Sequence, residues 1–173
     1  QIVRGECRST VMAENSGAIV LPNILSSRIY LKTANARCQT LLERWAEPFS
    51  CAAAMGGAEY PEGLIRTAWK WVLKNHPHDS IGGCSADPIH RQMETRFEWA
   101  DEIAEAVTSM ALQAVTDATD TSRLDENELA YQLFNPLNWE VTDLVRVTMD
   151  LDDTWFTANG VEISHENIHR GVR

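Results

Sequence analysis

The sequence of 173 residues lacks any long apolar run and is poor in basic residues. No stretch approaches the roughly 18 apolar residues of a membrane-spanning helix, so we expect no membrane span. Fifteen Lys and Arg stand against twenty-five Asp and Glu, which gives a formal net charge of −10. Because nucleic-acid binding depends mainly on clustered basic residues, this balance argues against a nucleic-acid partner.

Cysteine is scarce, and its spacing is not that of a disulfide framework. The four cysteines are widely scattered, with no CxxC pair: Cys7, Cys38, Cys51 and Cys84. Disulfide frameworks are typical of small, cysteine-dense secreted domains, so we interpret these residues as reduced thiols of a cytoplasmic protein. The first ten residues, QIVRGECRST, include neither an initiating Met nor the apolar core of a signal peptide. We therefore expect that this chain continues a longer one.

Helical periodicity dominates the first two thirds of a chain whose composition is that of an ordinary globular protein. Within residues 24–45, apolar positions recur at spacings of three and four, which predicts a helix that ends before Pro48. Its expected face is Leu31, Ala34, Cys38, Leu41 and Trp45. A short helix broken at Gly56-Gly57 should follow. A second long helix should open after Pro61 and end near Asn75, since Pro77 disfavours helical geometry at His76. Its expected face is Leu64, Ala68, Trp71 and Val72.

The third helix has the clearest signature. Asp87 is placed to be its N-cap, with Pro88 at the first helical position. The apolar positions that follow are spaced three and four apart: Ile89, Met93, Phe97, Ala100, Ala104, Val107, Ala111 and Ala114. Such a seam needs partner helices, which the first two supply, and we assign it to packing rather than to a cofactor. His90, in the first turn, is expected to be exposed.

The pattern changes after the polar segment 116–127. Residues 128–139 and 141–151 alternate between apolar and polar, which is typical of strands, and Asn135-Pro136 suits a turn between them. Too few strands remain to complete a β domain. The predicted fold is therefore mainly α: an antiparallel three-helix bundle followed by the first strands of a β domain. Its boundaries are expected at 23–120 for the bundle and 121–173 for a linker and the start of the β region.

One short segment, KNHPHDSIGGCS (74–85), concentrates groups that can bind metal. Neutral imidazole and carboxylate both suit Zn²⁺, but a zinc site takes four groups, or three and a water. His90, His165 and His169 have no helpful spacing, and Cys84 has no identifiable base beside it. From the residues alone, capping and loop packing is the simpler interpretation, and a metal role for His78 is the alternative.

Three stretches resemble the middle of bacterial glycoside hydrolase family 38 α-mannosidases. They are LPNILSSRIYLKTANARCQTLLERWAEPFS (21–50), RTAWKWVLKNHPHDSIGGCSADPIHRQMETRFEWADEIAEA (66–106) and LFNPLNWEVTDLV (133–145). The most specific signature is NHPHDS followed by RQMETRF. The resemblance implies a three-helix domain between a catalytic barrel and large β domains. Residues 1–22 would then be the exit segment from a barrel missing from this sequence.

The resemblance also implies roles for single residues. His78 matches the histidine that the helical domain gives to the active-site Zn²⁺, and Asp79 matches a carboxylate that contacts the sugar of an α-mannoside. A cap, or a brace for His78, is the alternative reading of Asp79. The family commonly has Cys where this chain has Gly82.

The other zinc ligands, the nucleophile and the acid/base carboxylate of the retaining mechanism belong to the barrel. No catalytic residue is expected in this chain, which should be inactive alone. Its expected partners are the α-mannoside and the barrel and β domains of the parent protein. An alternative from another class is a stand-alone helical scaffold or interaction module that keeps the loop without its chemistry.

Overall fold

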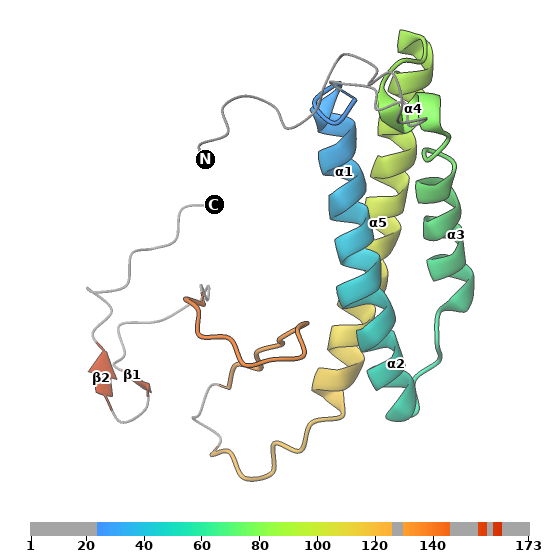
Figure 1. Ribbon diagram of the computed structural model, residues 1–173. Helices are drawn as coiled ribbons and strands as arrows, with labels where there is room; N and C mark the ends of the chain where they lie inside the picture. The colour runs from blue at the N-terminus through green and yellow to red at the C-terminus, as the bar shows by residue number, and fades with distance from the viewer. Residues whose placement is uncertain (1–23, 126–129, 146–155, 159–160, 164–173) are drawn as a thin grey trace, which may run out of the picture. The chain divides into compact units, whose positions relative to one another are not determined.

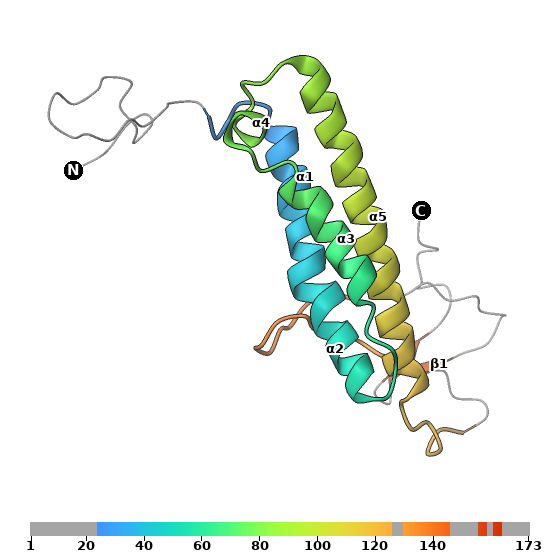
Figure 2. The same ribbon diagram turned by 90° about the vertical axis from the view of Figure 1, so that its right-hand side faces the viewer.

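Helices dominate the part of the chain that the computed structural model describes, which is residues 24–125, 130–145, 156–158 and 161–163. The chain divides into two compact units, with the boundary between Leu137 and Asn138. The first contains α1 (Ile29–Thr40), the π-helical segment η1 (Leu41–Ala46), α2 (Glu47–Met55), α3 (Glu62–Leu73), the short α4 (His78–Gly82) and α5 (Asp87–Asp117). α1, η1 and α2 form one continuous helical run, and with α3 and α5 they make an antiparallel three-helix bundle (Figures 1 and 2). The predicted mainly α class is confirmed.

The core lies along one face of α5, against which the other helices pack. Burial of these apolar side chains is the main driving force for folding. The buried cluster is Leu31, Cys38, Leu42, Ala46, Ile65, Ala68, Val72, Met93, Phe97, Ala100, Ala104 and Val107. Alanine at four of these positions lets helix backbones approach closely, while the larger side chains of Phe97 and Met93 are also buried in the cluster.

The prediction that the first helix ends before Pro48 is wrong. The helix passes through η1 and continues to Met55. Proline removes a backbone hydrogen bond and crowds the carbonyl four residues earlier, so an α-helix normally breaks there. The wider i→i+5 turns of a π-helix displace that carbonyl, and this accounts for the continuation.

The wide turn also changes which residues face the core. In an α-helix, positions four apart drift by about 40° per step, since 3.6 residues make a turn. Adding one residue to a turn removes much of this drift. The buried positions Cys38, Leu42, Ala46 and Ser50 accordingly recur every four residues. Leu41 and Trp45, predicted for the core face, are only half-buried.

The predicted faces of the other two helices need smaller corrections. α3 buries Ile65, Ala68 and Val72, whereas Leu64 is exposed and Trp71 half-buried. α5 buries the predicted seam from Met93 to Ala111, but Ile89 at its start is exposed. Its N-cap is Ala86, so Asp87 is the first helical residue rather than the cap.

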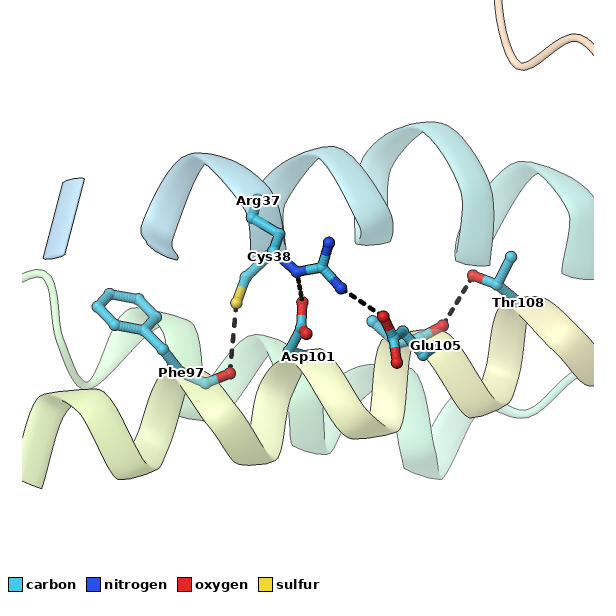
Figure 3. A network of polar contacts seen from close by, with 7 residues as sticks. Arg37, Cys38, Phe97, Asp101, Glu105 and Thr108 are labelled. Atoms are coloured by element: carbon cyan, nitrogen blue, oxygen red, sulfur yellow. Dashed lines mark hydrogen bonds and ion pairs between the residues drawn. The ribbon is translucent and has the colours of Figure 1, made fainter. Parts of the chain in front are cut away.

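Polar contacts join α1 to α5 beside the core (Figure 3). The Arg37 guanidinium lies 2.7 Å from the Asp101 carboxylate and also pairs with Glu105, one turn further along α5. The buried Cys38 thiol donates to the Phe97 carbonyl at 3.4 Å. Burial, and then the charge of Asp101, raises the pKa of Cys38 to about 11. This thiol therefore stays protonated and acts as a small core residue.

The strand predicted over residues 128–139 is not formed in its described part, because residues 130–139 adopt neither helix nor strand. Phe134 instead packs edge-on against Phe49 of α2, with ring centroids 5.5 Å apart, and Phe49 stacks on Trp45. Part of the second predicted strand, residues 146–151, lies outside the described residues. In the second unit, β1 (Phe156–Ala158) and β2 (Val161–Ile163) pair antiparallel with Phe156 opposite Ile163. This hairpin alone does not make a β domain.

Among the helices that the structure describes, none has both the length and the apolar character needed to cross a bilayer.

Phe97 gives a test of the core. It is 2% exposed in the middle of the bundle. Phe97→Ala should lower the free energy of unfolding by about 3–5 kcal/mol, the usual cost of truncating a buried aromatic side chain. Met110→Ala on the exposed side of α5 is the matched control, with an expected change within about 0.5 kcal/mol. Urea unfolding followed by circular dichroism measures both. A loss below about 1 kcal/mol for Phe97→Ala would contradict the observed packing.

Candidate functional site

The segment predicted to be a loop between the second and third long helices contains one helical turn. Pro77, with extended backbone, ends the connection from α3, and α4 runs from His78 to Gly82. Gly83 then reverses the chain with a φ of 90°. α4 lies at the end of the bundle where α1 and α5 begin (Figures 1 and 2). The candidate residues His78 and Asp79 therefore sit on a separate element at one end of the bundle.

Backbone hydrogen bonds hold the shape of α4. The Asp79 carbonyl accepts from the N–H groups of Cys84 at 3.1 Å and Ser85 at 3.2 Å, which closes the turn after the helix. Glycine is required at position 83 for two reasons. Its positive φ strains residues with a side chain, and a Cβ there would lie 2.6 Å from the Ser27 Oγ. The close approach of Ser27 to Gly83 fixes α4 against the start of α1.

Two cations from the start of α1 reinforce this attachment. The Arg28 Nε donates to the Gly83 carbonyl at 3.2 Å, while its guanidinium lies 2.5 Å from the Asp87 carboxylate of α5. The Lys32 ammonium donates to the carbonyls of Gly82, at 3.3 Å, and Ser27. We call Arg28, Lys32 and Asp87 the clamp. It supplies donors to the last carbonyls of α4, which have no partner within that helix.

Arg28 shows that the clamp has an energetic cost. It has a φ of 47° and is the one non-glycine residue with positive φ in the described part of the chain. Such a conformation costs on the order of 1–3 kcal/mol and persists where surrounding contacts outweigh it. The bonds to Gly83 and Asp87 supply these contacts. In return, the Arg28 guanidinium holds the pKa of Asp87 below its usual range.

His78 and Asp79 point away from this framework. Their side chains are 96% and 63% exposed, and the His78 Nε2 lies 3.0 Å from an Asp79 oxygen. A carboxylate at this distance favours a proton on Nε2 and leaves the lone pair on Nδ1. The pair therefore presents one oriented imidazole nitrogen and one carboxylate to whatever approaches this end of the bundle. Asp79 also accepts from the Cys84 thiol at 3.4 Å.

The two histidines of the HPH motif do different things. The His76 Nε2 lies 2.7 Å from the Asn35 Oδ1 of α1, and Asn35 donates in turn to Gln39. His76 thereby ties the end of α3 to α1 and is half-buried, unlike His78. Within the described ranges no three His, Cys, Asp or Glu side chains gather closely enough to hold a metal ion. The described residues could thus supply one metal ligand but not a complete centre.

His90 is buried, which corrects the prediction that it would be exposed. It is 1% exposed, on the inner face of the first turn of α5, and neither ring nitrogen makes a hydrogen bond with the described residues. Burial, and then the positive charge of Arg28, lowers its pKa, with Lys32 adding to this effect. The negative charge of Asp87 acts in the opposite direction without cancelling this effect. His90 is therefore a neutral imidazole packed between the clamp and α4.

Sequence reasoning missed the clamp and the burial of His90. Arg28 and Lys32 are four residues apart, which places them on one side of a helix start, but the carbonyls of Gly83 and Gly82 that they reach lie 55 and 50 positions away. No local sequence pattern predicts a hydrogen bond between residues so far apart in the chain. His90 does fall on the seam, one residue after Ile89 and three before Met93, and this spacing was the signal that could have indicated its burial.

Two solved structures share this fold. The chain has 44% sequence identity and a TM-score of 0.59 to a glycosyl hydrolase family 38 protein from Enterococcus faecalis, and the match covers 60% of this chain and 12% of that one. An α-mannosidase from Enterococcus faecalis V583 matches with the same identity, TM-score and coverage. These similarities place the bundle among the helical regions of family 38 proteins.

Sequence comparison gives the family. Residues 21–115 match the α-mannosidase middle domain, so the chain belongs to that family. It is also 41% identical over 133 residues to a Halalkalibacterium halodurans protein described, provisionally, as a mannosylglycerate hydrolase. That match covers 77% of this chain but only 14% of the relative. The recognised family resemblance is thus confirmed, and the chain spans a small part of the length of its relatives.

The lowered pKa of His90 predicts a pH-dependent stability. A group whose pKa is lower in the folded state stabilises the fold above its unfolded pKa, about 6.5 for His, and this stabilisation is lost as pH falls toward the folded value. The free energy of unfolding should therefore drop between pH 7.5 and pH 5.5. Urea titrations at intermediate pH measure the drop. His90→Phe should flatten the profile; an equal slope in His90→Phe would refute the assignment.

The Cys84–Asp79 contact predicts a difference in thiol reactivity. The hydrogen bond to the Asp79 carboxylate is the main reason why the pKa of Cys84 is raised. Asp79→Asn should lower that pKa and so speed alkylation of Cys84 at pH 7.5, because the thiolate is the reactive form. Mass spectrometry of each cysteine after timed iodoacetamide labelling measures the rates. Exposed Cys51 should react at the same rate in both proteins, and buried Cys38 only after unfolding. Unchanged labelling of Cys84 would argue against the contact.

Proposed function

We propose that the chain is the middle region of a zinc-dependent retaining α-mannosidase, to which it contributes one zinc ligand, His78, and one sugar contact, Asp79. Family membership and the two Enterococcus faecalis structures support the substrate class. The remaining ligands, the nucleophile and the acid/base group would come from another domain of the parent protein. By itself this chain would not catalyse hydrolysis.

The observation that carries the proposal is the contrast between the backbone and the side chains of α4. The backbone is held by the clamp, by the bonds to the Asp79 carbonyl and by the close contact of Gly83 with Ser27. The side chains of His78 and Asp79 are left 96% and 63% exposed. A loop that served only packing would be expected to bury or pair these groups with the bundle. A backbone that is held in place and presents exposed polar side chains suits a ligand site.

The donor chemistry fits a shared zinc centre. Zn²⁺ accepts imidazole nitrogen, and catalytic sites use three protein ligands with an open position. His78 would supply one of these through Nδ1, the nitrogen that Asp79 leaves with a lone pair. A bound Zn²⁺ would act as a Lewis acid toward sugar hydroxyls and help to hold the distorted ring. Asp79 would brace the imidazole, as carboxylates commonly do for metal-bound histidines, or accept a hydrogen bond from a sugar hydroxyl.

The competing function is a stand-alone helical scaffold or interaction module. In that case His78 and Asp79 would be solvated surface groups, and their replacement would change neither metal content nor turnover. The two functions differ in one measurable respect: only the enzyme couples α4 to metal content and turnover.

The experiment uses the longer parent protein with His78→Ala and Asp79→Asn. His78→Ala should lose metal and activity together, because one ligand of a fixed coordination sphere is removed. If Asp79 contacts the sugar, Asp79→Asn should keep near-normal zinc while kcat/KM for an aryl α-mannoside falls. Loss of zinc in Asp79→Asn would instead show that Asp79 holds His78 in place for the metal. Metal analysis and steady-state kinetics separate these results.

Two controls complete the design. Glu98→Gln, an exposed carboxylate on α5, should alter neither metal content nor kinetics. The 173-residue chain alone should release no product from the same aryl α-mannoside, with or without zinc. Turnover by the pure chain, or normal metal and kinetics in both α4 variants, would refute the proposed function.

A further inference from the structure

An open groove lined by polar and apolar side chains lies between α3 and α5, outside the candidate zinc site. Its volume is about 490 Å³, within the range of ligand pockets. It is lined by Trp71, Lys74, Gln92, Thr95, Arg96 and Trp99. We propose that this cavity, here called the α3–α5 groove, binds a pyranose that carries a carboxylate. The inference does not depend on the zinc site, because none of these residues belongs to α4.

Two positively charged side chains line the groove. Lys74 and Arg96 have no ion-pair partner among the residues that the structure describes, although the chain has a formal net charge of −10. Arg96 makes hydrogen bonds only to neutral groups, the Gln92 Oε1 at 3.0 Å and the Asn75 Oδ1 at 3.4 Å. Both side chains therefore remain available to an anion that enters the groove.

The same contacts orient the cations before any ligand arrives. The Lys74 ammonium lies 4.3 Å from the centre of the Trp71 ring, a cation–π distance. Gln92 and Asn75 hold the Arg96 guanidinium, and Asn75 is itself buried and donates to the Met93 carbonyl. Arginine forms paired hydrogen bonds with planar carboxylates, so a fixed guanidinium reduces the ordering cost of binding one.

The two tryptophans of the groove indicate which kind of ring the carboxylate ligand carries. Trp71 and Trp99 meet edge to face, with centroids 4.8 Å apart and planes inclined by 62°. A flat base is best held between parallel rings, which this arrangement does not offer. Trp99 is 44% exposed and leaves an indole surface open. The C–H groups of a saturated pyranose can lie on such a surface, and the Gln92 amide and Thr95 hydroxyl can bond ring hydroxyls.

The test is a ¹H–¹⁵N NMR titration of the full chain with D-glucuronate. The six Trp indole N–H groups report on separate places. Glucuronate should shift the Trp71 and Trp99 signals saturably, with little change at Trp69. Methyl glucoside, which lacks the carboxylate, should bind at least about tenfold more weakly, since a charge-assisted hydrogen bond contributes roughly 1.5–3 kcal/mol. Acetate, which lacks the ring, should also bind at least about tenfold more weakly, because it loses the apolar contact with the indoles.

Variants locate the site. Arg96→Gln and Lys74→Gln should each weaken glucuronate binding about tenfold, by loss of a charged contact. Trp99→Ala should abolish the saturable shift at Trp71. Arg66→Gln, an exposed arginine of α3 outside the groove, is the matched control and should bind like the parent chain. Far-UV circular dichroism confirms that each variant is folded.

Several outcomes would overturn the inference. Equal shifts with acetate would reduce the groove to a non-specific anion patch, and shifts spread over all six indoles would remove the site. A glutamate-rich peptide that binds at the groove while glucuronate does not would assign it to an acidic protein partner instead. Retained affinity in Arg96→Gln and Trp99→Ala would exclude this cavity as the binding place.

Discussion

The structure depends on close packing along the inner face of α5. The seam from Met93 to Val107 meets the first helical run on one side and α3 on the other. Alanines in the middle of the seam allow close approach, and interiors packed at crystal-like density do not deform gradually. The π-helical turn in η1 follows from this constraint. The wide turn keeps the buried positions of the first helical run facing α5. Over the same length, a regular α-helix would rotate these positions away from α5.

This packing reaches the candidate site through a small number of polar contacts. α5 begins with Asp87, which pairs with Arg28, and Arg28 bonds the carbonyl that ends α4. The strained backbone of Arg28 is tolerated because both contacts are made at once. His90 lies behind the same clamp, where its neutrality avoids a third positive charge beside Arg28 and Lys32. The geometry of the His78–Asp79 turn is therefore set by the positions of α1 and α5 rather than by α4, whose five residues are too few to form a stable helix alone.

Much of this could be read from the sequence, and the exceptions have physical causes. The three-helix class, the seam of α5 and the place of His78 and Asp79 between helices follow from periodicity, proline positions and a specific motif. The continuation through Pro48 could not be read, because propensity rules describe an α-helix and the π turn is a response to tertiary packing. Asp87 was given a local role as N-cap, but a cation 59 positions away competes for its carboxylate. The strand predicted near Phe134 failed because alternation indicates a strand only where a partner strand is available, and here Phe49 offers an aromatic contact instead.

The distribution of polar groups along the bundle separates what stabilises it from what is available for binding. Beyond Phe97, Asp101 and Glu105 of α5 pair with Arg37 of α1. Toward the start of α5, Arg28 and Asp87 pair with each other. Among the described residues near them, His78 and Asp79 meet only each other and Cys84, and Lys74 and Arg96 contact only neutral groups. Exposed charges without a partner are common on protein surfaces and by themselves indicate no function. These particular groups are nevertheless suited to recognition, since a ligand gains most from polar groups that are already oriented and not yet neutralised. The half of the bundle around Ala104 and Val107 then serves mainly to fix α5, and through α5 the end at which binding would take place.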